Sequence, residues 1–314
     1  MPRGVAQRKK PVYTLSVSDR GVSNLAGRVW GSWTAGISED VLQSKADELK
    51  RTAKFGRGNI VVYDLHEVLL HRARRDDLDR VCKGLELPPA KIMVIRHFVE
   101  TIAERTGLSL EETRNAFEHL NYNKKDLSNY GTKKLVNSRS RWTTMLFPGE
   151  DVVVTDEQRL EGESCISDLN KLPLVQACIR TIEEEFGVSL PVAEVNNYFD
   201  GANCGLGWHG DAERTINVIM RFGPTSFTMP LNIQWFYNQS PFGDIMKLPL
   251  HEGDCLVFSA KALGTDFKDP PLKRPTLRHA VGRNAQPKPT LQEKRAKKRR
   301  ASDDATPAKQ RRLM

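Results

Sequence analysis

A histidine and an aspartate stand one residue apart in the most informative stretch of the chain, His209-Gly210-Asp211. On an extended segment side chains alternate between two faces, so residues 209 and 211 point the same way. An imidazole and a carboxylate on one face are two of the three ligands of a facial 2-His-1-carboxylate triad, which suits iron(II) and leaves coordination positions open. A His-x-Asp pair also arises by chance, so this interpretation depends on a third ligand.

Only two histidines follow Asp211, namely His251 and His279. His251 precedes Gly253-Asp254, a turn signal that predicts a place at the rim of the fold. His279 lies in a later strand-forming segment, which can return to the first one. We therefore expect His279 to complete the triad, with His251 as the alternative, and each could instead be an ordinary surface or core histidine.

The region after residue 150 must position these side chains, and it is rich in short strand-forming runs separated by Gly, Pro, Asn and Asp. This punctuation favours an antiparallel sandwich or barrel over a parallel sheet. Strands are predicted at 192–199, 215–222, 231–237, 255–259 and 276–281. An amphipathic helix is predicted at 173–186, between Pro173 and Gly187.

The region before residue 150 is predicted to be mainly helical. One helix is expected between Ser38 and Gly56, a second from Pro88-Pro89 to Gly107, and a third after Ser109. Residues 59–63 form a predicted strand between the first two helices.

Composition limits the class of protein. Apolar residues make up 39% of the 314, enough for a core, and the five cysteines form no CxxC pair, which argues against a disulfide scaffold or a Cys-rich zinc module. Neither a secretory signal nor a long apolar run is visible, so we expect a soluble intracellular protein that spans no membrane. Without a GxxxxGK[ST] or GxGxxG motif, a P-loop or Rossmann nucleotide site is disfavoured.

The net charge of +9 is concentrated at the two ends of the chain. Residues 1–10 hold four basic residues and no acidic one, and residues 285–314 hold ten basic and three acidic ones. Subtracting these from the totals of 48 and 39 leaves 34 basic and 36 acidic residues between the ends. The last segment has too few large apolar residues to fold, so we expect it to be disordered. Its run Lys294–Arg300 predicts a nuclear import address, a phosphate-binding tail, or merely a solubilising one.

Several motifs together resemble the AlkB-like branch of the iron(II)- and 2-oxoglutarate-dependent dioxygenases. The resemblance covers about residues 194–284 and is carried by Asn196-x-Tyr198, His209-x-Asp211, Glu252–Phe258 and Thr276–Ala280. It implies an α+β fold with a double-stranded β-helix, or jelly-roll, core. It also implies that His209, Asp211 and His279 hold iron(II), and that Asn196 and Tyr198 contact 2-oxoglutarate.

The sequence departs from this family after the distal histidine. AlkB-like enzymes usually carry a pattern resembling RxNxTxR there, whose first arginine pairs with the far carboxylate of 2-oxoglutarate, whereas this chain reads AVGRNAQP from Ala280. Arg283 is the candidate clamp, because a planar guanidinium binds a carboxylate through two hydrogen bonds. Arg221 is the alternative, and Arg278 should point the other way from its neighbour His279.

The resemblance implies hydroxylation or oxidative demethylation of a C–H bond, with iron(II), 2-oxoglutarate and dioxygen. A nucleic-acid base is the favoured substrate, given the nuclear-type tail and the aromatic Trp208 as a stacking candidate. The alternatives are a protein side chain or small molecule as substrate, or a non-catalytic nuclear binding protein on a decayed oxygenase fold. We expect a nuclear or cytoplasmic protein, with an import receptor as partner of the Lys294–Arg300 run.

The predicted organisation has four parts. Residues 1–35 form a basic, extended segment, and residues 36–150 form a mainly helical region of unassigned role. Residues 151–284 form the jelly-roll oxygenase core, and residues 285–314 form a disordered basic tail.

Overall fold

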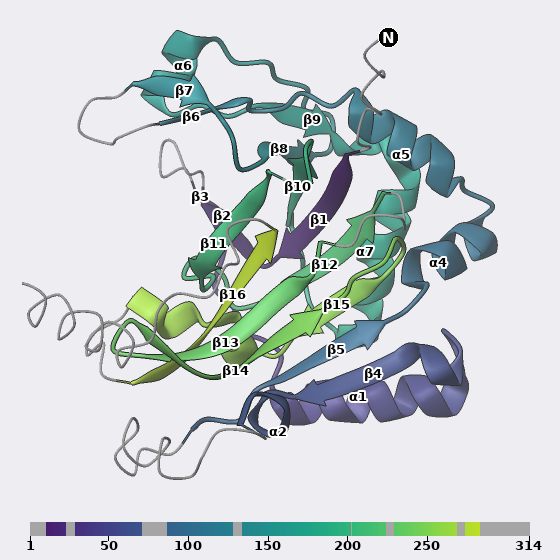
Figure 1. Cartoon of the computed structure of the whole chain (residues 1–314). Helices are drawn as coiled ribbons and strands as arrows, with labels where there is room; N and C mark the ends of the chain where they lie inside the picture. Colours follow the sequence, from purple (N-terminus) through teal and green to yellow (C-terminus); the bar gives the residue numbers. More distant parts are fainter. Residues whose placement is uncertain are drawn as a thin grey trace, which may run out of the picture.

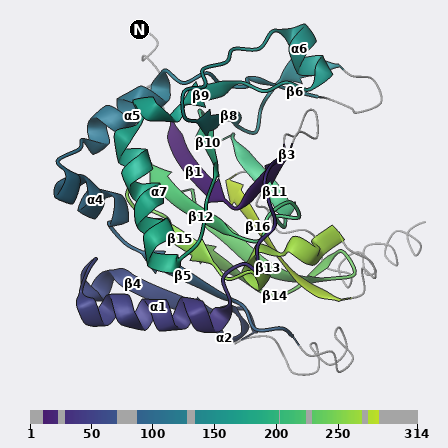
Figure 2. The same ribbon diagram turned by 180° about the vertical axis from the view of Figure 1, so that it is seen from behind.

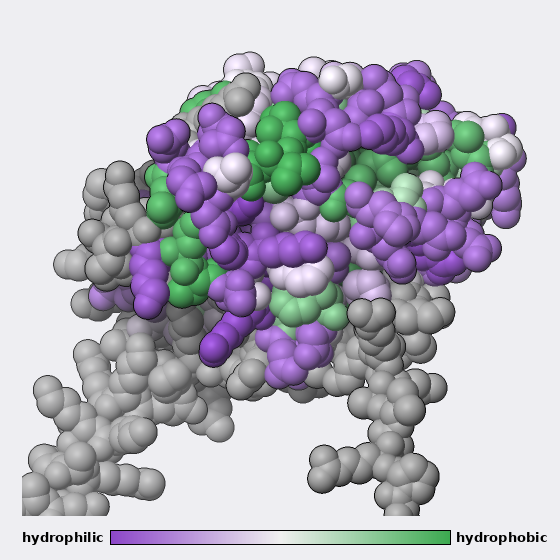
Figure 3. All heavy atoms as spheres, turned by 90° about the horizontal axis from the view of Figure 1, so that it is seen from above, coloured by the Kyte–Doolittle hydropathy of each residue, from purple (hydrophilic) through white to green (hydrophobic). Residues whose placement is uncertain are grey.

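The computed structural model describes residues 11–22, 29–70, 87–127, 134–201, 203–223, 229–268 and 274–282. Within these ranges the fold is α+β, with six α-helices and sheets whose strands pair antiparallel except for β8 with β9 (Figure 1). None of the helices in these ranges is both long enough and apolar enough to cross a bilayer. Figure 3 shows hydrophilic side chains over much of the upper face, with hydrophobic patches between them.

A large sheet of eight strands forms the middle of the molecule. Its order is β4 (Ile60–Asp64), β5 (Lys91–Ile95), β15 (Cys255–Phe258), β12 (Asn217–Phe222), β1 (Val12–Ser18), β10 (Val192–Tyr198), β8 (Trp142–Phe147) and β9 (Ile166–Asp168). The strand nearest the N-terminus, β1, therefore lies between β12 and β10 and pairs with both. All seven of its residues are buried, as expected for a strand inside a covered sheet.

A second sheet of four strands packs on one face of the large sheet. Its order is β11 (Gly205–His209), β16 (Pro275–Gly282), β13 (Leu231–Tyr237) and β14 (Ser240–Leu248). An apolar cluster joins the two sheets, with Val94 and Leu256 from the large sheet against Ile233 and Leu277 from the small one. Two further strand pairs are β2 (Arg20–Val22) with β3 (Val29–Gly31), and β6 (Lys125–Leu127) with β7 (Leu135–Asn137).

Helices cover the opposite face of the large sheet (Figure 2). The main ones are α1 (Glu39–Thr52), α4 (Phe98–Thr106), α5 (Leu110–Glu118) and α7 (Pro173–Phe186); α2 (Leu65–Leu70) and α6 (Asp156–Glu161) are shorter. Short 3-10 helices lie at Arg57–Asn59, Leu169–Lys171, Lys261–Leu263 and Thr265–Lys268. The apolar faces of the main helices pack on Leu15, Val195 and Met220 of the sheet. The layers are therefore helices, large sheet and small sheet.

The residues at which the helices α1, α5 and α7 begin are those predicted from the sequence. Ser38 and Ser109 cap α1 and α5 by accepting hydrogen bonds from the backbone N–H groups of Val41 and Glu112. The helix predicted after Pro173 is α7, and it ends at Gly187.

The helix expected from Pro88-Pro89 to Gly107 is wrong in its first half. Residues 91–95 form β5, and only α4 is helical, with His97 in the left-handed region (φ 54°) between them. The run Lys91–Ile95 is buried on both faces, and a short continuous apolar run does not distinguish a buried strand from a buried helix. The segment is a strand because it pairs with β4 and β15 in the large sheet.

Three regions that the sequence separates contribute to one sheet. The segment predicted as extended, 1–35, supplies β1, and the region 151–284 supplies β9, β10, β12 and β15. The mainly helical region 36–150 supplies β4, β5 and β8, and its described residues also form α1, α2, α4 and α5. The tail 285–314 lies outside the described residues.

The central place of β1 predicts a large cost for a cavity in this strand. Leu15 is fully buried, opposite Val195 on one side and Met220 on the other. Replacing Leu15 with alanine should lower the free energy of unfolding by about 2–5 kcal/mol. Val153→Ala, at a side chain that is 72% exposed, should change it by less than about 0.5 kcal/mol. Urea unfolding checks both, and equal stability of the two variants would place β1 outside the cooperative core.

Candidate metal centre

A cavity of about 500 Å³ lies between the two sheets. Its wall on the large sheet is polar, because β8, β10, β1 and β12 turn their hydrogen-bonding side chains toward it. Residues paired directly across neighbouring strands share a face, and the strand registers align one row of them: Thr143, Asn196, Thr14 and Arg221. All four line the cavity.

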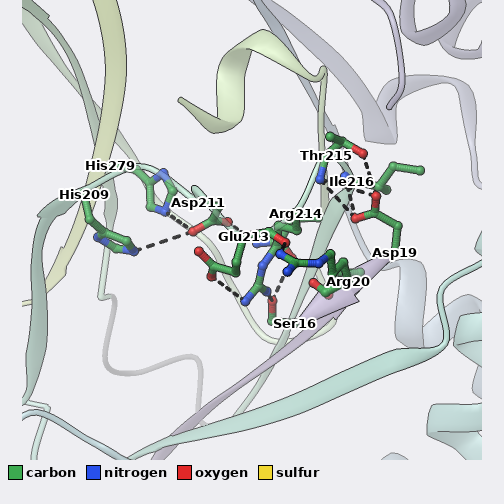
Figure 4. Close-up of polar contacts among 12 residues, drawn as sticks. Ser16, Asp19, Arg20, His209, Asp211, Glu213, Arg214, Thr215, Ile216 and His279 are labelled. Atoms are coloured by element: carbon green, nitrogen blue, oxygen red, sulfur yellow. Dashed lines mark hydrogen bonds and ion pairs between the residues drawn. The ribbon is translucent and has the colours of Figure 1, made fainter. Parts of the chain in front are cut away.

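His209, Asp211 and His279 meet in this cavity (Figure 4). Their ligand atoms all lie within 4.8 Å of one another. Asp211 Oδ1 is 3.8 Å from His209 Nε2 and 3.5 Å from His279 Nε2. The imidazole ring centroids are 4.4 Å apart. The sequence predicted these three residues as one group, and the structure places them together.

Strand pairing and one tight backbone contact bring the three side chains to this place. His209 ends β11 and lies opposite His279 of β16, after a β-bulge that follows Leu206. The next residue, Gly210, has no room for a side chain, because a Cβ there would lie 2.1 Å from the carbonyl oxygen of Gly264. The Asp211 N–H then donates to the Leu263 carbonyl at 3.0 Å. The residue between the histidine and the aspartate is therefore glycine for a steric reason.

The protonation states suit metal binding. Burial, together with the charge of the neighbouring His279, lowers the pKa of His209 to about 4, so the imidazole is neutral at pH 7. Burial alone would raise the pKa of Asp211, but His279 and Arg214 more than offset it and hold this pKa below its ordinary value. A neutral imidazole and an ionised carboxylate are the forms that bind metals. The donor set, two imidazole nitrogens and one carboxylate oxygen, fits iron(II).

A buried arginine supplies hydrogen-bond donors on the same wall. Arg221 is 4% exposed, and its Nη2 donates to the Met229 carbonyl at 3.0 Å. Its Nε and Nη1 have no hydrogen-bond partner within the described ranges, and neither does the hydroxyl of Thr14 beside it in the row. Burial lowers the pKa of this guanidinium, opposed by Tyr198 and Asp254. Two N–H groups of a buried cation are thus available to an anion.

The other residues singled out in the sequence fall into two groups. Asn196 and Tyr198 of β10 line the cavity, 8% and 3% exposed. Burial raises the pKa of Tyr198, so its hydroxyl stays protonated. His251 is exposed, away from the three clustered ligands. Arg283 lies outside the described residues.

Two side chains next to the candidate metal ligands point elsewhere. The Arg278 guanidinium lies over the rings of Phe236 and Phe267 and donates to Gln239, and it does not line the cavity. The expectation that Trp208 stacks on a substrate stays a prediction. Trp208 packs in a small apolar cluster with Phe236 and is not part of the cavity wall.

Sequence reading missed the contribution of the N-terminal strand. Thr14 and Ser16 line the cavity, and Leu15 and Val17, which alternate with them, face the helices. The alternation of polar and apolar residues in β1 was the available signal. It points to a strand with two different environments, although it does not say which strands lie beside it.

Asp19, just after β1, connects this strand to the segment that follows the candidate metal ligand Asp211. It is 1% exposed and accepts hydrogen bonds from the N–H groups of Thr215 and Ile216 and the hydroxyl of Thr215 (Figure 4). It also accepts from the N–H and hydroxyl groups of Thr34. Burial raises the pKa of Asp19, but these hydrogen bonds outweigh it and bring the pKa below its ordinary value of 3.8.

This cluster predicts a pH-dependent contribution to stability. A carboxyl group with a lowered folded-state pKa stabilises the protein above its unfolded pKa, and this contribution is lost as the pH falls through the folded-state value. Asp19→Asn should therefore lower the unfolding free energy by about 1–3 kcal/mol at pH 7. The difference from wild type should shrink below about pH 4. Urea unfolding from pH 7 to 3 measures it, and a difference that grows on acidification would contradict the assignment.

Comparison with known proteins shows that the chain is similar in sequence to a viral protein. No family model matches it. Uncharacterized protein R156 of Acanthamoeba polyphaga mimivirus is 32% identical over 208 residues, which are 66% of this chain and 76% of the viral protein. Identity at this level over most of the viral protein shows common descent. The chain therefore belongs to the same family as the mimivirus protein R156.

Proposed function

We propose that this protein is an iron(II)- and 2-oxoglutarate-dependent dioxygenase that hydroxylates, or oxidatively demethylates, a C–H bond of its substrate. The observation that carries the proposal is the facial group His209, Asp211 and His279 in a cavity that also holds the unsatisfied guanidinium of Arg221. A 2-His-1-carboxylate donor set needs further ligands, and the arginine can bind an anion that supplies them.

The order of the strands supports a jelly-roll core for this enzyme. Along the chain β10, β12 and β15 belong to the large sheet, and β11, β13, β14 and β16 belong to the small one. Such exchange between two facing antiparallel sheets is typical of jelly rolls, which have eight strands. The eighth is β1, between β10 and β12. The proposed oxygenase core therefore extends beyond residues 151–284 and includes 12–18.

Arg221 is the arginine we assign to the co-substrate. 2-Oxoglutarate carries two carboxylates, one beside its keto group and one at the far end. The Arg221 Nε and Nη1 groups can bind the far carboxylate, with the Thr14 hydroxyl next to them and the Tyr198 hydroxyl on the adjoining strand. A guanidinium held by Met229 is already oriented, which reduces the entropy lost on binding.

The residues of the chain bind and orient; the oxidation belongs to the bound groups. Iron(II), when bound, couples decarboxylation of 2-oxoglutarate by dioxygen, which gives succinate and carbon dioxide, to insertion of the second oxygen atom into a substrate C–H bond. His209, Asp211 and His279 would hold the metal at the wall of the cavity. Arg221 and Tyr198 would bind and orient the co-substrate, and both are buried, 4% and 3% exposed.

The substrate we favour is a nucleic-acid base. A cavity of about 500 Å³ is large enough for the small co-substrate and one inserted group, as enzymes that act on an unstacked base require. Arg141 and Lys268 line the cavity and could contact a phosphate group, although Asp126, Glu194 and Glu213 line it as well. The run Lys294–Arg300 would add contact to phosphate or direct the protein to the nucleus through an import receptor.

Removal of a ligand tests the reaction class. His209→Ala should lose iron affinity by more than the roughly 10–100-fold typical of an outer-shell change, and it should stop succinate release from 2-oxoglutarate. His251→Ala, at an exposed histidine outside the cavity, is the matched control and should behave as wild type. Iron content after anaerobic purification and succinate release are measured. Equal iron in wild type and His209→Ala would exclude the metal centre.

The same succinate assay identifies the substrate class when it is repeated with N-methylated oligonucleotides and with methylated peptides. The class that stimulates turnover is the substrate class.

Replacement of the buried arginine tests the co-substrate site. Arg221→Lys keeps a positive charge but cannot form two parallel hydrogen bonds, so 2-oxoglutarate should bind about 10- to 100-fold more weakly. Arg278→Lys changes an equally buried arginine outside the cavity, 6% exposed, and should leave binding unchanged. Calorimetric titration under anaerobic conditions measures both dissociation constants. An unchanged value for Arg221→Lys would move the role to Arg283 or another arginine.

A further inference from the structure

A chain of hydrogen bonds lies behind the carboxylate of Asp211. Asn217 Nδ2 donates to Asp211 Oδ2 at 2.7 Å, and Asn217 Oδ1 accepts from the Ser16 hydroxyl at 2.7 Å. The Ser16 oxygen in turn accepts from Arg214 Nη1 at 3.1 Å (Figure 4). The four residues come from β1, β12 and the loop between β11 and β12. They connect the strand nearest the N-terminus to the proposed metal centre.

The donor and acceptor chemistry allows only one direction for this chain. A guanidinium donates but never accepts, so the Ser16 oxygen must accept from Arg214. The single hydroxyl proton of Ser16 then points to Asn217 Oδ1. That bond orients the Asn217 amide with its NH₂ group toward Asp211, where an ionised carboxylate can only accept. The acceptor-only carboxylate of Asp211 therefore sets the orientation of the Asn217 amide, and the Ser16 hydroxyl, whose oxygen accepts from Arg214, supports it by donating to Asn217 Oδ1.

Burial makes this arrangement stiff. Ser16, Asn217 and Arg214 are 6%, 4% and 9% exposed, so water does not compete effectively for their hydrogen bonds. Arg214 also donates to Glu213 Oε1 at 2.8 Å. Burial lowers the pKa of Arg214, but Asp211 and Glu213 more than offset it and raise this pKa, so the residue stays a cation. The cation helps to compensate the buried charge of Asp211.

We infer that Asn217, held by Ser16 and Arg214, is a positioning residue that limits Asp211 to one metal-binding oxygen. Oδ2 is occupied by the amide, whereas Oδ1 faces the Nε2 atoms of His209 and His279. A carboxylate that binds through one oxygen leaves a coordination position open that a two-oxygen mode would fill. The inference rests on the proposed metal centre and adds the group that sets its ligand number.

The test measures metal binding directly and does not depend on turnover. Full-length wild type and Asn217→Ala are titrated with Co²⁺ alone, and visible absorption reports both the affinity and the coordination geometry. Asn217→Ala should bind Co²⁺ about 10- to 100-fold more weakly. Its absorption bands should also change, because the released Oδ2 becomes able to coordinate. Asn232→Ala is the matched control: Asn232 is likewise 4% exposed and on a strand, but it lies outside the cavity.

The outcomes separate this inference from the proposed function. Wild type that binds no Co²⁺ overturns the metal centre and the inference with it. Wild-type affinity and bands in Asn217→Ala overturn the inference alone. The inference is supported if only Asn217→Ala, and not Asn232→Ala, shifts both readouts. If Asn217→Ala does not fold, Ser16→Ala replaces it. Removal of that hydroxyl should also weaken binding and alter the bands, and unchanged values would overturn the inference.

Discussion

An ionised carboxylate buried between two sheets is costly unless cations and hydrogen bonds compensate it, and the structure around Asp211 meets this requirement. Arg214 supplies a cation, Asn217 donates to one oxygen, and the two histidines face the other. Each partner comes from a different place in the chain. The fold must therefore hold β1, β11, β12 and β16 in fixed register for the carboxylate to be tolerated at all.

The strand β1 shows how one short segment serves both stability and chemistry. Leu15 and Val17 pack under the helices, whereas Thr14 and Ser16 face the cavity. Since successive side chains of a strand point to opposite faces, a shift of one residue would bury the polar set among the helices and expose the apolar set to the cavity. Asp19, at the end of this strand, connects it to Thr215 and Ile216 and so opposes such a shift.

The common descent with mimivirus R156 covers 66% of this chain and 76% of the viral protein. The proposed oxygenase differs from the AlkB-like pattern where the arginine after the distal histidine is expected. In this proposal Arg221, from a strand that precedes the distal histidine, takes the place of that arginine, and β1 completes the jelly roll. A core completed by the N-terminal strand would support the same proposed oxygenase reaction, although its strands follow one another in a different order along the chain.

Much of the local structure follows from the amino-acid sequence. Capping residues and apolar periodicity located α1, α5 and α7, and strand-forming runs located β10, β12, β13, β15 and β16 within a few residues. The spacing of His209 and Asp211, with the choice of His279 over His251, singled out the three side chains that the structure groups together.

The tertiary structure alone decided what depends on distant neighbours. The apolar run Lys91–Ile95 became a strand because a sheet edge beside β15 was there to pair with it. Thr14, Ser16 and Asn217 acquired roles at the site because β1 pairs between β10 and β12, a contact about 200 residues distant in sequence. Local propensity carries no information about such pairing, since hydrogen bonds between strands form equally well with any backbone. Only the packing of the whole core selects one partner.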